Sequence, residues 1–139
     1  MSAWHILNAA NVKQLEIERG KSRIAEARAR LLPSGISYDQ DKVQTSPTDQ
    51  MAAGVAEIVD LEEKLDRLRA QKALLLQEID RLINMLDDEF EKTILVGYFI
   101  EGESIENMAE RINYSRSGAY YIFNRGLANV EKILKKEIL

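Results

Sequence analysis

The chain has 139 residues, of which 30% are charged and 6% aromatic, a balance that favours long exposed helices over one large globular core. It contains no cysteine, which excludes disulfides and zinc-thiolate sites, and no apolar run approaches the ~20 residues that a membrane span needs. Lys13 and Glu16 interrupt the early apolar stretch, so we expect no secretory signal and a cytoplasmic location.

The first predicted element is one helix over residues 3–32, which are rich in Ala, Leu, Arg, Glu and Lys. Its apolar stripe repeats every seven residues, at Ile17, Ile24 and Leu31. Pro33, Ser34 and Gly35 end this helix and begin a connector over residues 33–46.

A longer helix is predicted from Ser46, which is a suitable N-cap before Pro47, to about Leu86. Nine of its eleven seam positions are apolar, a strong coiled-coil signal. These positions are Met51, Gly54, Ile58, Leu61, Leu65, Leu68, Lys72, Leu75, Ile79, Leu82 and Leu86. A lone helix cannot bury such a stripe in water, so we expect the first helix to fold back antiparallel on it. Three further apolar residues widen the stripe and predict a homodimer through the long helices: Val55, Leu76 and Ile83.

Charge changes sign along the last third of the chain. Residues 87–110 hold eight acids and one base, whereas residues 111–139 hold six bases and two acids. The net charges are therefore −7 and +4, and one acidic and one basic surface would follow from this distribution.

Residues 87–139 are predicted to fold as a three-helix domain with a helix-turn-helix, separate from a coiled-coil assembly domain over residues 1–86. Asp87 or Asp88 can cap the first of the three helices, and Gly102 ends it. The other two helices have caps at Ser104 and Ser115. Between them, small Ala109 allows a close crossing, and Asn113 tolerates the positive φ that the turn requires.

The last helix has an apolar face for the core and an opposite polar face. The inward residues are Ala119, Ile122, Phe123, Leu127, Val130 and Leu134. The predicted DNA-binding residues are Ser115, Arg116, Ser117, Tyr120, Tyr121, Asn124 and Arg125. Arginine can bridge guanine O6 and N7, asparagine can bridge adenine N6 and N7, and the helix N-terminus with its serine suits a phosphate. One of the two tyrosines could instead pack against a neighbouring helix.

The run from Ile105 to Ile122, followed by Leu127, resembles region 4 of bacterial sigma factors. In that family the positions matching Arg116, Ser117, Tyr120 and Tyr121 contact the promoter −35 element, and Arg116 keeps the common sigma residue type. Nearly the whole chain is similar to small phage and prophage proteins of Gram-positive bacteria, grouped with the ArpU and RinA late-gene activators. This resemblance implies an all-helical transcription regulator.

We therefore expect a regulator of phage or prophage genes that binds double-stranded DNA and contacts host RNA polymerase. One alternative is a DNA-packaging adaptor of the small-terminase type, and another is a coiled-coil module that binds only protein. No catalytic residue, metal site or cofactor is expected, because His5 is the single histidine and no glycine-rich phosphate loop occurs.

Overall fold

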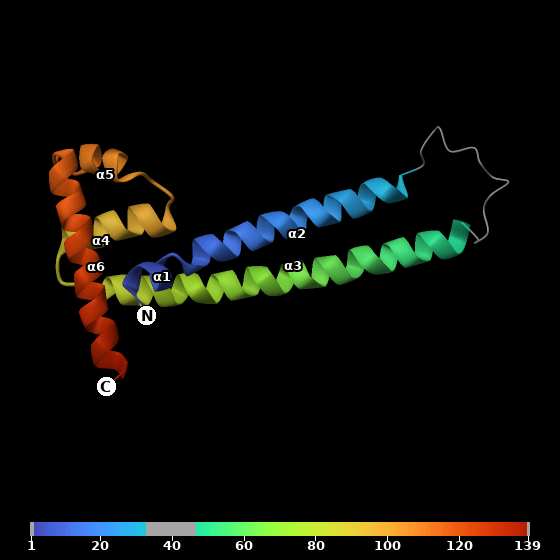
Figure 1. Cartoon of the computed structure of the whole chain (residues 1–139), viewed down its shortest axis with the longest axis horizontal. Coiled ribbons are helices and arrows are strands. Elements are labelled where there is room, and N and C mark those ends of the chain that lie inside the picture. Colours follow the sequence, from blue (N-terminus) through green and yellow to red (C-terminus); the bar gives the residue numbers. More distant parts are fainter. Residues whose placement is uncertain (1, 33–46, 139) are drawn as a thin grey trace. The chain divides into compact units, whose positions relative to one another are not determined.

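The computed structural model describes residues 2–32 and 47–138, and every regular element in these two ranges is a helix (Figure 1). The all-helical prediction is confirmed for this part of the chain. The connector over residues 33–46 and the cap predicted at Ser46 lie outside the described residues.

Contacts along the chain divide it into two compact units. The first unit combines Met1–Lys13 with Lys72–Leu139, and the second is Gln14–Gln71. The sequence predicted one domain over residues 1–86. In the structure, residues 1–13 and 72–86 belong instead to the unit of the C-terminal helices. The two divisions differ because the first helical residues and the end of the long helix pack into the same core as the C-terminal helices.

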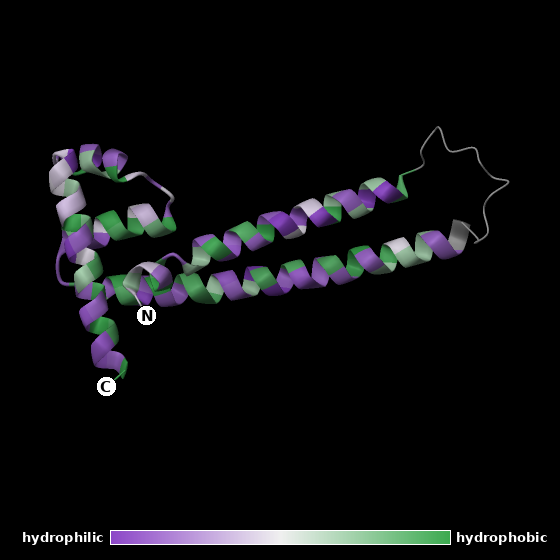
Figure 2. Cartoon of the chain, in the orientation of Figure 1, coloured by the Kyte–Doolittle hydropathy of each residue, from purple (hydrophilic) through white to green (hydrophobic). Residues whose placement is uncertain are grey.

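The second unit consists of parts of two helices, α2 (Ala9–Leu31) and α3 (Pro47–Asn84). Within it the two helices run antiparallel, because Arg28 pairs with Glu62 and Arg30 with Glu57. Its small core holds Ile17, Ile24 and Leu65, and Leu61 and Leu68 pack against them half-buried. Hydrophilic and hydrophobic residues alternate along both helices, as expected where one stripe is buried (Figure 2).

The first unit begins with α1 (Ala3–Leu7), which ends at Asn8 before α2 starts. The prediction of one uninterrupted helix over residues 3–32 is therefore wrong at Asn8. The spacing of apolar residues along the sequence could not predict this break, because the residues before it pack against distant parts of the chain. Leu7 is fully buried in the core, and the Trp4 ring lies 5.2 Å from the Phe99 ring, centroid to centroid.

Two helical segments follow α3, with no gap between the first and the second: α4 (Glu89–Leu95) and a π-helical turn, η2 (Val96–Ile100). Of the two caps proposed for α4, Asp88 is the one used, since its carboxylate accepts from the Phe90 N–H at 2.8 Å. Gly97 allows α5 (Ile105–Arg111) to approach η2 closely, because a Cβ there would overlap the Met108 side chain.

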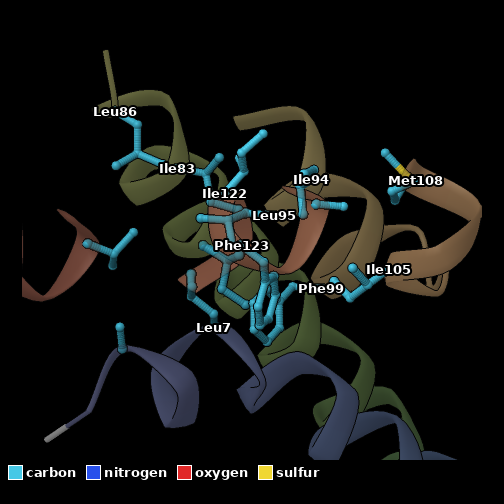
Figure 3. Packing of buried hydrophobic residues seen from close by; sticks show 14 of the residues in the cluster. Leu7, Ile83, Leu86, Ile94, Leu95, Phe99, Ile105, Met108, Ile122 and Phe123 are labelled. Carbon is cyan, nitrogen blue, oxygen red and sulfur yellow. The ribbon is translucent and has the colours of Figure 1, made fainter. Parts of the chain in front are cut away.

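The last helix after α5 is α6 (Arg116–Ile138). Leu7, Ile94, Leu95, Phe99 and Phe123 converge in the centre of the core, while Ile105 and Met108 come from α5 (Figure 3). This core fixes α6 against α1, α4 and α5 and leaves its other side exposed.

Candidate nucleic-acid interface

The turn between α5 and α6 has the local structure that the sequence predicts. Ser104 caps α5 by accepting from the Asn107 N–H at 3.0 Å, and Ser115 caps α6 by accepting from the Gly118 N–H at 3.0 Å. Asn113 has φ 59°, the left-handed conformation expected of it. Together these features reverse the chain within a few residues.

The inner faces of α5 and α6 pack in the hydrophobic core. Ala109 and Ala119, both small and both at most 3% exposed, allow the two helices to pack closely. Ile122, Phe123 and Val130 are also buried, and Leu127 and Leu134 are half-buried, as expected for the inward face. Because one side of α6 is used in this way, its rotation about its own axis is fixed.

The opposite side of α6 presents five of the seven predicted DNA-binding side chains to solvent. Their spacing along the helix keeps them on one face: Arg116, Ser117, Tyr120, Tyr121 and Asn124. The side chain of Arg116 is 73% exposed, and Tyr121 is 65% exposed. Neither tyrosine is buried against a neighbouring helix, although Tyr120, at 40%, is partly covered.

Glu106 on α5 binds two of these side chains, and its sequence position alone did not single it out. The Tyr120 hydroxyl donates to Glu106 Oε1 at 3.0 Å, and Arg116 Nη2 lies 3.2 Å from the same oxygen. The hydrogen bond from its own backbone amide, then the one from Tyr120, lower the pKa of Glu106, and the bond to Glu106 raises the pKa of Tyr120. The contact could have been suspected only after α5 had been placed against α6.

Arg125, predicted to lie on the DNA-binding face, takes part in a polar network with α4. Its Nε donates to Glu91 Oε2 at 2.6 Å, and its Nη2 donates to Asp88 Oδ2 at 3.0 Å. The hydrogen bond to Glu91 raises the pKa of Arg125. Asn129 donates to the other oxygen of Glu91 at 2.9 Å, so both oxygens of this carboxylate, whose residue is 2% exposed, accept a hydrogen bond.

This network also reaches the exposed face of α6. The Arg125 guanidinium lies 5.6 Å from the centre of the Tyr121 ring, within cation–π range. Arg125 therefore contacts the Tyr121 ring, while Glu91 and Asp88 neutralise the positive charge of Arg125. Glu91 was expected to belong to an acidic solvent-facing surface, and its burial corrects that interpretation.

Among the described residues, no cluster of three or more His, Cys, Asp or Glu side chains could hold a metal ion. Neither described range contains a helix with the length and apolar character to cross a membrane. Comparisons of the chain with known protein families, curated protein sequences and solved structures found no match.

Proposed function

We propose that this chain is a sequence-specific DNA-binding regulator of transcription, in which α5 and α6 act as a helix-turn-helix. The observation that supports this most strongly is the row of exposed side chains on the first three turns of α6, from Arg116 to Asn124. The row combines an arginine, a serine, an amide and two phenols, which together offer donors, acceptors and aromatic faces to base edges. The buried opposite side of the helix holds the row in a fixed orientation.

The regulatory role is supported by two features besides this row. The run from Ile105 to Ile122 resembles sigma-factor region 4, whose proteins act with RNA polymerase. Several acids at or next to the ends of α4, η2 and α5 are exposed and so available to a basic protein partner: Asp87, Glu89, Glu101 and Glu110. RNA polymerase of a phage host is the partner we propose, with phage or prophage genes as the target.

We propose further that the pairing of α2 with α3 is a coiled-coil hairpin that joins two copies of the chain. Of the three residues expected to face a second chain, Ile83 is buried in the core and Leu76 is half-buried against it, so these two do not support a dimer. Val55 remains exposed, and it supports a dimer together with Met51 and Val59, which are spaced four apart on the same face and are each about half exposed. A dimer would present two DNA-binding faces. A ring of eight or more copies would instead favour the small-terminase alternative.

Selection of bound duplexes from a random pool, with and without bacterial RNA polymerase, tests the main proposal. We expect a defined site to be enriched. Arg116→Ala should then weaken binding to that site by about 5- to 150-fold, the equivalent of about 1–3 kcal/mol for one bidentate guanine interaction, and relax the preference at one base pair.

Lys135→Ala is the matched control, because Lys135 is also an exposed cation on α6 but lies beyond the proposed face. It should affect all sequences alike. Parent-like binding by Arg116→Ala, Tyr120→Ala and Tyr121→Ala together would remove the support for α6 as the DNA-contacting helix.

A further inference from the structure

A groove in the unit Gln14–Gln71 collects positive charge along the boundary between α2 and α3. It encloses about 340 Å³, and Gly20, Leu61, Leu65 and Leu68 line its floor. Four exposed cations line its sides: Arg19 and Arg23 from α2, and Lys64 and Arg67 from α3. The acid that lines it is Glu16.

The four cations face one another across the groove. Arg19 and Arg23 lie one turn apart on α2, about 6 Å along its axis, and Lys64 and Arg67 lie three residues apart on α3. The antiparallel register that pairs Arg28 with Glu62 places these two pairs on opposite sides of the groove. Within the described ranges, none of the four has an ion-pair partner.

The other edge of the same helix pair shows the contrasting arrangement. There a second groove is lined by bases and acids together, including Glu62, Asp66, Arg28 and Arg69. Arg28 pairs with Glu62, and Arg69 lies 3.8 Å from Asp66. Two edges built from the same helices thus differ in charge, and an anion lying between the four cations at the first edge would relieve their mutual repulsion.

In the unit that carries α6, two arginines of the last helix are already paired with carboxylates. The two units have the same net charge of −2, from ten bases and twelve acids in this unit and nine bases and eleven acids in Gln14–Gln71, so the difference lies in which cations are paired. Arg116 is paired with Glu106, and Arg125 is paired with Glu91 and Asp88. Arg116 and Arg125 are therefore shared with carboxylates, whereas in the part of the chain that the structure describes the four cations that line the groove are not.

We propose that the groove formed by Arg19, Arg23, Lys64 and Arg67 binds the phosphodiester backbone of nucleic acid without regard to sequence. The planar guanidinium fork matches a phosphate oxygen pair, and cations on both sides suit a ligand with charges repeated along its length. This inference extends the proposed function, since it supplies the sequence-independent part of DNA binding, but it can be tested separately.

The test measures binding of a random-sequence duplex by fluorescence anisotropy over a range of salt concentrations. The variant R19Q/R23Q/K64Q/R67Q should bind more weakly. The plot of log K against log salt should also become shallower, its negative slope shrinking in magnitude by about 0.9 for each phosphate that the variant no longer neutralises. The variant R28Q/R69Q changes cations of the same two helices at the paired edge, and its slope should match that of the parent.

Single variants guard against a loss of folding in the fourfold variant. Arg23→Gln and Lys64→Gln change exposed side chains. Each should reduce the magnitude of the salt slope by about 0.9 and leave the melting temperature unchanged. A parent-like slope in the folded groove variants overturns the inference. Binding of poly-glutamate rather than DNA by the parent also overturns it, in favour of an acidic protein partner. A lowered slope without any enriched site in the selection supports the groove and contradicts the proposed function.

Discussion

Tyr120 donates its hydroxyl to Glu106 Oε1 at 3.0 Å, an oxygen that also attracts Arg116. Two of the side chains proposed to contact bases are thus held by one carboxylate of the preceding helix. In the proposed complex, DNA would either share these side chains with Glu106 or displace it, and the negative charge of Glu106 would repel the incoming phosphates.

Glu106→Gln should therefore strengthen DNA binding. The glutamine keeps an acceptor for Tyr120 but removes the charge, and the exposed ion pair of Arg116 with Glu106 is weak, so we expect a gain of about 2- to 5-fold. Glu110→Gln, at an exposed acid on the same helix, is the control and should change affinity less. Weaker binding of Glu106→Gln to the enriched site, with a relaxed preference at one base pair, would instead show that the carboxylate positions Arg116 for binding.

The turn before α6 depends on the left-handed conformation of Asn113. Asn113→Gly should leave the free energy of unfolding nearly unchanged, because glycine adopts φ 59° without steric cost. Asn113→Val should lower it by about 1–2 kcal/mol, since a β-branched residue clashes in this region. Urea unfolding of both variants measures the difference, and equal stability of the two would refute the role given to the turn.

The buried carboxylate of Glu91 should be needed for stability. Glu91→Ala leaves Arg125 and Asn129 without their partner, and we expect a loss of about 3 kcal/mol, the lower end for a broken buried pair because Arg125 is partly exposed. Glu89→Ala, at an exposed acid of the same helix, should change stability by less than about 0.5 kcal/mol. Thermal unfolding of the two variants compares these losses directly.

Local signals predicted local structure well. Ser104, Ser115 and Asn113 act as expected, because a cap or a turn depends on residues within three or four positions. The seven-residue period likewise identified Leu65 and Ile79 as buried, but Met51, assigned to the same seam, is 55% exposed. Features set by distant contacts could not be predicted in this way.

The burial of Glu91 requires Arg125 and Asn129, more than thirty residues away, and the contact of Glu106 with Tyr120 requires the closed turn. The break at Asn8 follows from packing around Trp4 and Leu7. In each case the residue type alone indicates a solvent-exposed polar residue or a continuous helix. The partner that changes this outcome comes from another helix.

Arg81 should make stability depend on acid pH. It donates to Glu78 on its own helix and to Glu137 near the end of α6, and these hydrogen bonds lower the pKa of both carboxylates from their ordinary value of 4.5. A carboxylate with a lowered pKa in the folded state contributes stability above its unfolded pKa and loses it as pH falls through the folded value. The melting temperature of the parent should therefore fall more between about pH 5 and about pH 3 than that of Arg81→Met, and parallel curves would contradict this.

The exposed apolar row on α3 should determine whether two copies associate. Val55 and Val59 are 48% and 47% exposed, and a partner chain would cover them. We expect the parent to sediment as a dimer at tens of micromolar and Val55→Glu/Val59→Glu to sediment as a monomer, because two buried unpaired charges cost far more than an interface of this kind contributes. Leu15→Glu is the control, since Leu15 is an exposed apolar residue of α2, 61% exposed, in the same unit. It should leave the dimer intact. A parent that remains monomeric at this concentration would show that the row is not an interface, and α6 would then contact DNA as a single copy.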